Sequence, residues 1–238
     1  MPGSRLRRAS TRGVTVSENL AEQKLPGFSS KKELAYEAIK ESILSHSLRP
    51  GDAVSESAFA EALQISRTPV REALMALEQE GLVKIVPTRG IFVTEITVRD
   101  IREIYEIRQA LECLAVRKAA LTPDLSPLDP LLAVLETASR GRESVSYDSL
   151  FQVDIDLHRF IRDTARNSRL SQILENLQDQ IHRIRVLSPR VDGRMDTTTR
   201  EHLAIIHALK QRDPDLAAQA MREHLHNAQD NIINFLAY

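Results

Sequence analysis

Three short amphipathic segments followed by a hairpin pattern occupy residues 33–95, and they constrain the fold of this 238-residue chain more than any other feature. Tyr36, Ile39 and Ile43 have the three- and four-residue spacing of a helix with one buried face. Pro50 and Gly51 follow it, and together they predict a turn. A first helix is therefore expected to end before this turn.

A second, shorter helix is predicted from Ser55, and a third from about Thr68 to Glu80, with Gly81 directly after it. The β-rich runs "LVKIV" and "IFVTEI" then lie on either side of "PTRG", which is the pattern of a hairpin. Three short helices and a hairpin predict a winged helix-turn-helix, whose third helix enters the major groove of DNA.

From Thr97 onward, no strand-like alternation or internal repeat interrupts the helical pattern. We therefore predict a mostly α-helical protein, with a winged helix-turn-helix at residues 33–95 and an all-α helical bundle at residues 96–238. The helices of the bundle are expected at about residues 98–121, 127–140, 146–166, 169–187, 198–211 and 213–236.

Residues 1–32 form a polar, basic extension with seven basic and two acidic side chains, for which we expect no stable structure. The whole chain has a formal charge of -1, so contact with nucleic acid must depend on the local placement of basic residues. No apolar run reaches the ~18 residues of a membrane span, and the single Cys113 cannot form an internal disulfide. We expect a cytoplasmic protein with no membrane partner.

The segment "SRTPVREAL" has two arginines, Arg67 and Arg71, in the first turns of the third predicted helix. A helix N-terminus has partial positive charge, so cations there are unfavourable unless an anion lies beside them. DNA phosphates and the edge of guanine would supply that anion. We predict Thr68 as the N-cap of this helix and Pro69 as its first residue.

The landmarks "RPGD", "SRTPVREAL", "LEQEGLV" and "PTRGIFV" occur in this order within about residues 35–93. In these landmarks the segment resembles the DNA-binding domain of GntR-type bacterial transcription regulators. The segment "IYEIRQALECLAVRKAA" is similar to the first helix of the FCD effector domain, the all-α domain of the FadR branch of that family. The two resemblances together cover about residues 33–236.

The GntR resemblance implies that five residues lie at the DNA: Arg67, Thr68 and Arg71 on the recognition helix, and Arg89 and Gly90 at the tip of the wing. It also implies a homodimer whose two recognition helices bind a palindromic operator in double-stranded DNA. Some relatives contact DNA through an arginine of the second helix, but Ser57 occupies that position here.

Helical rotation places three histidines of the bundle, His158, His202 and His224, on inward faces. Asp154 lies one turn before His158 on the same face. His202 and His224 are each 11 residues from Asp213, where the last two helices turn, so an antiparallel hairpin would bring them to the same height. The residues alone leave two alternatives open, a metal site or four separate core and surface side chains.

The FCD resemblance implies the metal site, because many FCD domains bind a divalent ion through an Asp-x-x-x-His helix and two later histidines. Zn²⁺, Ni²⁺, Mn²⁺ or Fe²⁺ would suit this ligand set, and an octahedral ion would keep two positions open. Effectors of this branch are often small organic acids. The resemblance implies that Arg108 faces the effector cavity, where a guanidinium would pair well with a carboxylate, and Arg162 is a second candidate.

These expectations combine in one hypothesis: a dimeric transcription regulator, a repressor, whose operator binding is controlled by a small carboxylate at a metal site. One alternative is a metal-dependent enzyme that uses the helical bundle. Against it, the sequence shows no recognisable general base beside the proposed site and no phosphate-binding glycine loop. Another alternative is a regulator whose signal is the metal itself.

Overall fold

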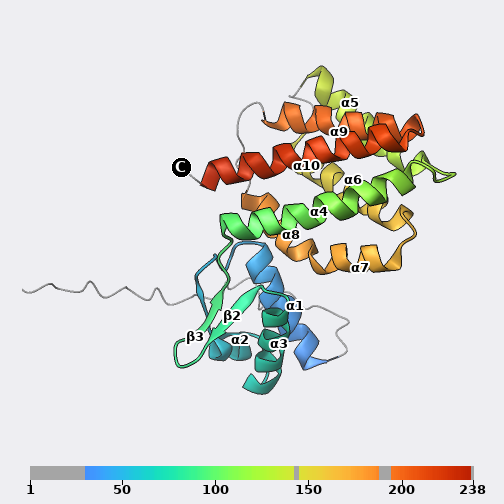
Figure 1. The fold of residues 1–238 in the computed structure, drawn as a ribbon. Coiled ribbons are helices and arrows are strands. Elements are labelled where there is room, and N and C mark those ends of the chain that lie inside the picture. The colour runs from blue at the N-terminus through green and yellow to red at the C-terminus, as the bar shows by residue number, and fades with distance from the viewer. Residues whose placement is uncertain (1–29, 142–144, 188–193, 237–238) are drawn as a thin grey trace, which may run out of the picture. The chain divides into compact units, whose positions relative to one another are not determined.

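The computed structural model describes residues 30–141, 145–187 and 194–236, and the chain divides into two compact units between Glu95 and Ile96. Figure 1 shows one unit with a small sheet and one built from helices. Most of the expected basic extension lies outside the described residues. Its last residues do not: Ser30 caps a helix that begins at Lys31, slightly before the expected boundary.

The N-terminal unit is a winged helix-turn-helix, as predicted. Its elements are α1 (Lys31–Leu44), β1 (Ala53–Val54), α2 (Glu56–Ala62), α3 (Arg67–Gln79), β2 (Val83–Val86) and β3 (Gly90–Val93). The antiparallel sheet has the order β1-β3-β2, and the hairpin of β2 and β3 is the wing. Strand β1 was not predicted, because two residues are too few to show an alternating pattern.

One hydrophobic core joins the three helices and the wing. Ile39 of α1, Phe59 of α2 and Leu74 of α3 are at most 2% exposed, and Leu82 packs with them. Because interiors of this kind are closely packed, the core holds α2 and α3 at a fixed separation.

The start of α3 differs from the prediction. The helix begins at Arg67 after Ser66, whose side chain makes no capping hydrogen bond, so the prediction of Thr68 as N-cap was wrong. Pro69 is then the third helical residue. This position tolerates proline because the first N–H groups of a helix have no acceptor within it.

The C-terminal unit consists of α4 (Val98–Ala119), η2 (Ser126–Leu128), α5 (Asp129–Arg140), α6 (Tyr147–Thr164), α7 (Ser168–Asn176), α8 (Gln178–Leu187), α9 (Arg194–Lys210) and α10 (Pro214–Leu236). The predicted all-α fold is confirmed. The helix expected at residues 169–187 is two helices that meet at Leu177, where neither proline nor glycine marks a break.

Helix α10 packs along α4 and α9, and α6 packs against α4 and α5. The buried stripe of α6 consists of Val153, Leu157 and Ile161. It is rotated from the predicted inward face, which included Asp154 and His158. These two residues lie instead on the flank of the stripe and are only partly buried.

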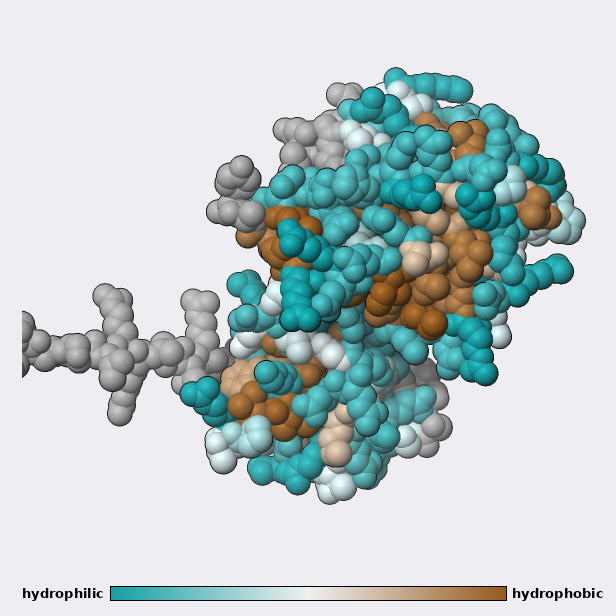
Figure 2. All heavy atoms as spheres, in the orientation of Figure 1, coloured by the Kyte–Doolittle hydropathy of each residue, from teal (hydrophilic) through white to brown (hydrophobic). Residues whose placement is uncertain are grey.

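Hydrophobic side chains also gather at the surface of the C-terminal unit along α4 (Figure 2). Ile107 and Leu114 of this helix are 40% and 45% exposed, and Leu121, just after its end, is 68% exposed. Within the described ranges, no helix combines the length and the hydropathy that a membrane span requires.

Candidate nucleic-acid interface and metal centre

The first two turns of α3 present three of the residues expected at DNA. Arg67, Thr68 and Arg71 are all exposed. Arg71 makes two hydrogen bonds to the carboxylate of Glu56 at the start of α2, from its Nε at 3.2 Å and from its Nη2 at 2.9 Å. Arg67 lies one turn earlier on the same face of α3, so the two side chains project from one exposed surface of the helix.

The tip of the wing presents Arg89 and Gly90, the other two residues expected at DNA. A turn closes between Val86 and Arg89, where Arg89 N–H donates to the Val86 carbonyl at 3.0 Å, and Thr88 has a φ of 63°. Gly90 has a φ of 117°, a conformation that side chains rarely adopt. Arg89 and Gly90 are both exposed.

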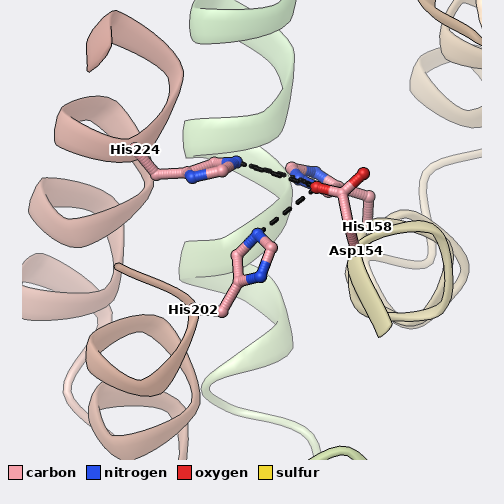
Figure 3. A group of neighbouring side chains, drawn as sticks. All are labelled: Asp154, His158, His202 and His224. Carbon is pink, nitrogen blue, oxygen red and sulfur yellow. Dashed lines mark hydrogen bonds and ion pairs between the residues drawn. The ribbon is translucent and has the colours of Figure 1, made fainter. Parts of the chain in front are cut away.

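The four predicted metal ligands converge in the C-terminal unit. Asp154 and His158 come from α6, His202 from α9 and His224 from α10, and Figure 3 shows all four side chains directed at one point. Oδ1 of Asp154 is 3.4 Å from Nε2 of His158, 3.3 Å from Nε2 of His202 and 4.0 Å from Nε2 of His224. All four potential ligand atoms lie within 4.8 Å of one another.

These separations fit a single metal ion. With metal–ligand bonds of about 2.1 Å, neighbouring ligand atoms lie about 3.0–3.4 Å apart and opposite ones about 4.2 Å. Nε2 of His202 gives a second indication, because it is buried and makes no hydrogen bond within the described residues. A buried nitrogen without a partner is costly unless something binds it.

Two carboxylates lie behind the histidines. Nδ1 of His158 hydrogen-bonds to Glu112 of α4, and Nδ1 of His224 hydrogen-bonds to Glu201 of α9 at 2.9 Å. An ionised carboxylate can only accept, so each Nδ1 carries the proton. The lone pair of each Nε2 is therefore directed at the centre, which is the arrangement that metal-binding histidines use.

The second oxygen of Asp154 faces a cation. Nε of Arg185 on α8 lies 3.0 Å from Oδ2 of Asp154. Burial alone would raise the pKa of Asp154, but the charge of Arg185 and the adjacent imidazoles of His158 and His202 outweigh it and hold this pKa well below its usual value. Asp154 is thus an ionised carboxylate, and its Oδ1 faces the point where the histidine Nε2 atoms converge.

The surroundings shift the pKa values of His224 and His158 in opposite directions. Burial lowers the pKa of His224 to about 3, so this ring is neutral and available as a ligand. Burial acts in the same direction on His158, but Glu112 and Asp154 outweigh it and raise its pKa. Protons therefore compete with a metal chiefly at His158.

A cavity of about 100 Å³ adjoins the cluster. Its polar lining comes from Tyr105, Arg108, Tyr147, Asp154, Arg185, Thr198, Thr199, His202 and His224, and its apolar lining includes Leu135, Leu150, Phe151 and Ile232. This size suits a molecule of a few carbon atoms. Two cations and two hydroxyl-bearing threonines make the cavity suitable for an anion that also accepts hydrogen bonds.

Arg108 lies at this cavity, 1% exposed, with its Nε donating to Oε1 of Glu112 at 2.7 Å. Glu112 therefore links Arg108 to His158. Arg162 does not line this cavity. It lies beside a separate, smaller hollow and pairs with Asp163 and Glu175.

Sequence reasoning missed four charged residues that support these sites: Glu56, Glu112, Arg185 and Glu201. Glu112 carried a usable signal, because it follows Arg108 by one turn on the same helix face. Glu201 is the direct neighbour of His202. Glu56 and Arg185 carried none, since each meets its partner from a different helix.

Comparison with known proteins gives two family matches. Residues 31–93 match the bacterial regulatory proteins of the gntR family, and residues 103–227 match the FCD domain.

Full-length relatives agree with these matches. The chain is 30% identical over 202 residues to the HTH-type transcriptional regulator YdhC of Bacillus subtilis, covering 84% of this chain and 90% of that protein. It is 30% identical over 197 residues to the HTH-type transcriptional repressor RspR of Escherichia coli, covering 83% of this chain and 86% of that protein. The crystal structure of a GntR transcriptional regulator from Rhodococcus sp. RHA1 matches with a TM-score of 0.70 at 25% identity, over 88% of this chain and 100% of that one.

The carboxylates behind the histidines provide a test of the metal centre. We expect Glu112→Gln and Glu201→Gln each to lower the affinity for Zn²⁺ by about 10- to 100-fold, because an amide holds the Nδ1–H tautomer less firmly. Glu223→Gln, at the exposed neighbour of His224 on α10, is the matched control. Competition with a chromophoric chelator measures the affinity, and equal values for all four proteins would contradict the assignment.

Proposed function

The chain belongs to the GntR family and has an FCD domain. We propose that it is a repressor whose affinity for DNA is controlled by a small organic acid bound at a metal centre. Its general role follows from the family: it is a DNA-binding transcription regulator. The observation that carries the finer proposal is the convergence of Asp154 and three histidine Nε2 atoms beside an anion-compatible cavity. The repressor RspR among the relatives supports the sign of regulation.

The exposed arginines support DNA recognition by α3. Arg67 and Arg71 project from the turns that a winged helix-turn-helix inserts into the major groove. One bidentate contact from arginine to guanine contributes roughly 1–3 kcal/mol of discrimination. Thr68 lies between them, and Arg89 and Gly90 at the wing tip would contact the minor groove or the backbone.

A homodimer is supported by the exposed hydrophobic residues Ile107 and Leu114 of α4 and Leu121 just after this helix. Contiguous apolar surface of this kind is typical of protein interfaces. A two-fold dimer places two recognition helices on two half-sites, so the operator is expected to be a palindrome.

The charges around the cluster support an anionic effector. Arg108 pairs with Glu112, Arg185 pairs with Asp154, and Glu201 pairs with His224. The two guanidinium groups and three carboxylates sum to a charge of -1, which a divalent cation changes to +1. The ion would supply open coordination positions for a carboxylate oxygen. Arg108, which also lines the cavity, would bind the acid through its guanidinium.

Arg71→Ala is expected to weaken binding to a cognate duplex by about 5- to 150-fold, the equivalent of one lost bidentate base contact. The duplex is obtained by selection from a random library with the wild-type protein, and gel shift measures affinity. Helicity and oligomeric state should not change, because Arg71 is exposed. Unchanged affinity would refute the role of this residue.

The double variant His202→Ala, His224→Ala is expected to lose the metal, because it removes two of four ligands. The double variant His207→Ala, His226→Ala is the control, since it removes exposed histidines from the same two helices. Plasma emission spectroscopy measures metal content per chain. Wild-type stoichiometry in the first variant would disprove the assignment, and circular dichroism verifies that both variants fold.

We expect metal-loaded protein to release DNA when a small carboxylic acid is added, with a shift in affinity of about 5- to 150-fold. The acid must bind the two DNA-binding states with different affinity, since equal affinity would shift nothing. A panel of C3 to C6 acids, titrated against the protein–DNA complex, measures this. Release by the metal alone would instead make the metal the signal, and turnover of an acid would favour an enzyme.

A further inference from the structure

The guanidinium of Arg71 is held through one of its two edges. Nε and Nη2 donate separately to the two oxygens of Glu56, at 3.2 Å and 2.9 Å. Two parallel hydrogen bonds fix the plane of the guanidinium as well as its distance from the carboxylate. The pair connects α2 with α3, so Arg71 is oriented by a residue outside its own helix.

The other edge remains available to a ligand. Arginine has five N–H donors in a planar fork, and Glu56 uses the pair formed by Nε and Nη2. Nη1 and the remaining hydrogen of Nη2 form the end of the fork, whose two donors match O6 and N7 of guanine. The side chain of Arg71 is 65% exposed, so this end is open to solvent.

Glu56 is itself well anchored. Ser55 caps α2, with its Oγ accepting from Ala58 N–H at 3.2 Å, and Phe59 holds the helix in the core that α3 shares. The side chain of Glu56 is only 23% exposed. The backbone of Glu56 is therefore held in place, and its carboxylate can orient Arg71.

Arg67 offers a contrast on the same surface. It lies one turn before Arg71 and is exposed, but it makes no hydrogen bond or ion pair within the part of the chain that the structure describes. Of the two arginines, one is oriented before DNA arrives and the other must be ordered by the DNA itself.

We propose that Glu56 is a positioning residue for DNA recognition, which holds Arg71 in the orientation that recognises a guanine. This inference rests on the proposed role of Arg71 at DNA. A carboxylate near the phosphates opposes DNA binding through its charge. Neutralising Glu56 should therefore have opposite effects on two quantities: affinity for DNA in general stays equal or rises, and base discrimination at one position falls.

The test is a selection of duplexes from a random library by the full-length wild type and by Arg67→Ala, Arg71→Ala and Glu56→Gln. The position whose base preference Arg71→Ala removes is the one that Arg71 recognises, and Arg67→Ala defines its control position in the same way. Competition titrations with singly substituted duplexes then give the preference for guanine at each position. Thermal unfolding verifies the fold, since an exposed ion pair contributes little stability.

Glu56→Gln is expected to lower the preference for guanine at the Arg71 position by at least about fivefold, and to leave the Arg67 position unchanged. If Arg71→Ala removes a preference and Glu56→Gln keeps it, the inference is overturned and the proposed DNA contact stands. An equal loss at both positions also overturns it, because the effect would then be general. If Arg71→Ala changes no preference, the proposed contact fails and the inference fails with it.

Discussion

The carboxylate of Asp154 divides its two oxygens between two kinds of partner, and the functional arrangement of the C-terminal unit depends on that division. Oδ2 faces Arg185 of α8 at 3.0 Å, and Oδ1 faces three imidazole nitrogens from α6, α9 and α10 at 3.3–4.0 Å. A buried carboxylate is costly unless charged or polar partners compensate it. Arg185 provides that compensation on one side, and the arrangement leaves the other side for a cation.

Both candidate sites use a carboxylate to orient the group that would bind the ligand. Glu56 holds Arg71 in the DNA-binding unit, and Glu112 and Glu201 hold His158 and His224 in the other. In each case the carboxylate binds one edge of a planar group and leaves another edge available to the ligand. Orientation of this kind reduces the ordering that a ligand must otherwise impose. It also makes specificity depend on residues that need not touch the ligand.

Local periodicity predicted the winged helix-turn-helix and the helical bundle, and together with the FCD resemblance it predicted the four residues of the cluster. It succeeded there because an i, i+4 pair on one helix and two positions symmetric about Asp213 are determined by helix geometry alone. It failed where a contact depends on the relative placement of separate helices, as in the pairs of Glu56 with Arg71 and of Arg185 with Asp154. The break at Leu177 escaped prediction because no glycine or proline marks it, and the start of α3 at Arg67 because Thr68 and Pro69 have the pattern of a cap and a first helical residue.

The central claim is that Asp154, His158, His202 and His224 form one metal centre. Anomalous diffraction from crystals of the protein purified with its native metal tests this most directly, because scattering at an absorption edge locates and identifies the ion. The account predicts one anomalous peak, with Oδ1 of Asp154 and the three Nε2 atoms about 2.0–2.2 Å from it. Electron density without a peak at this point, from protein that still contains stoichiometric metal, would contradict it.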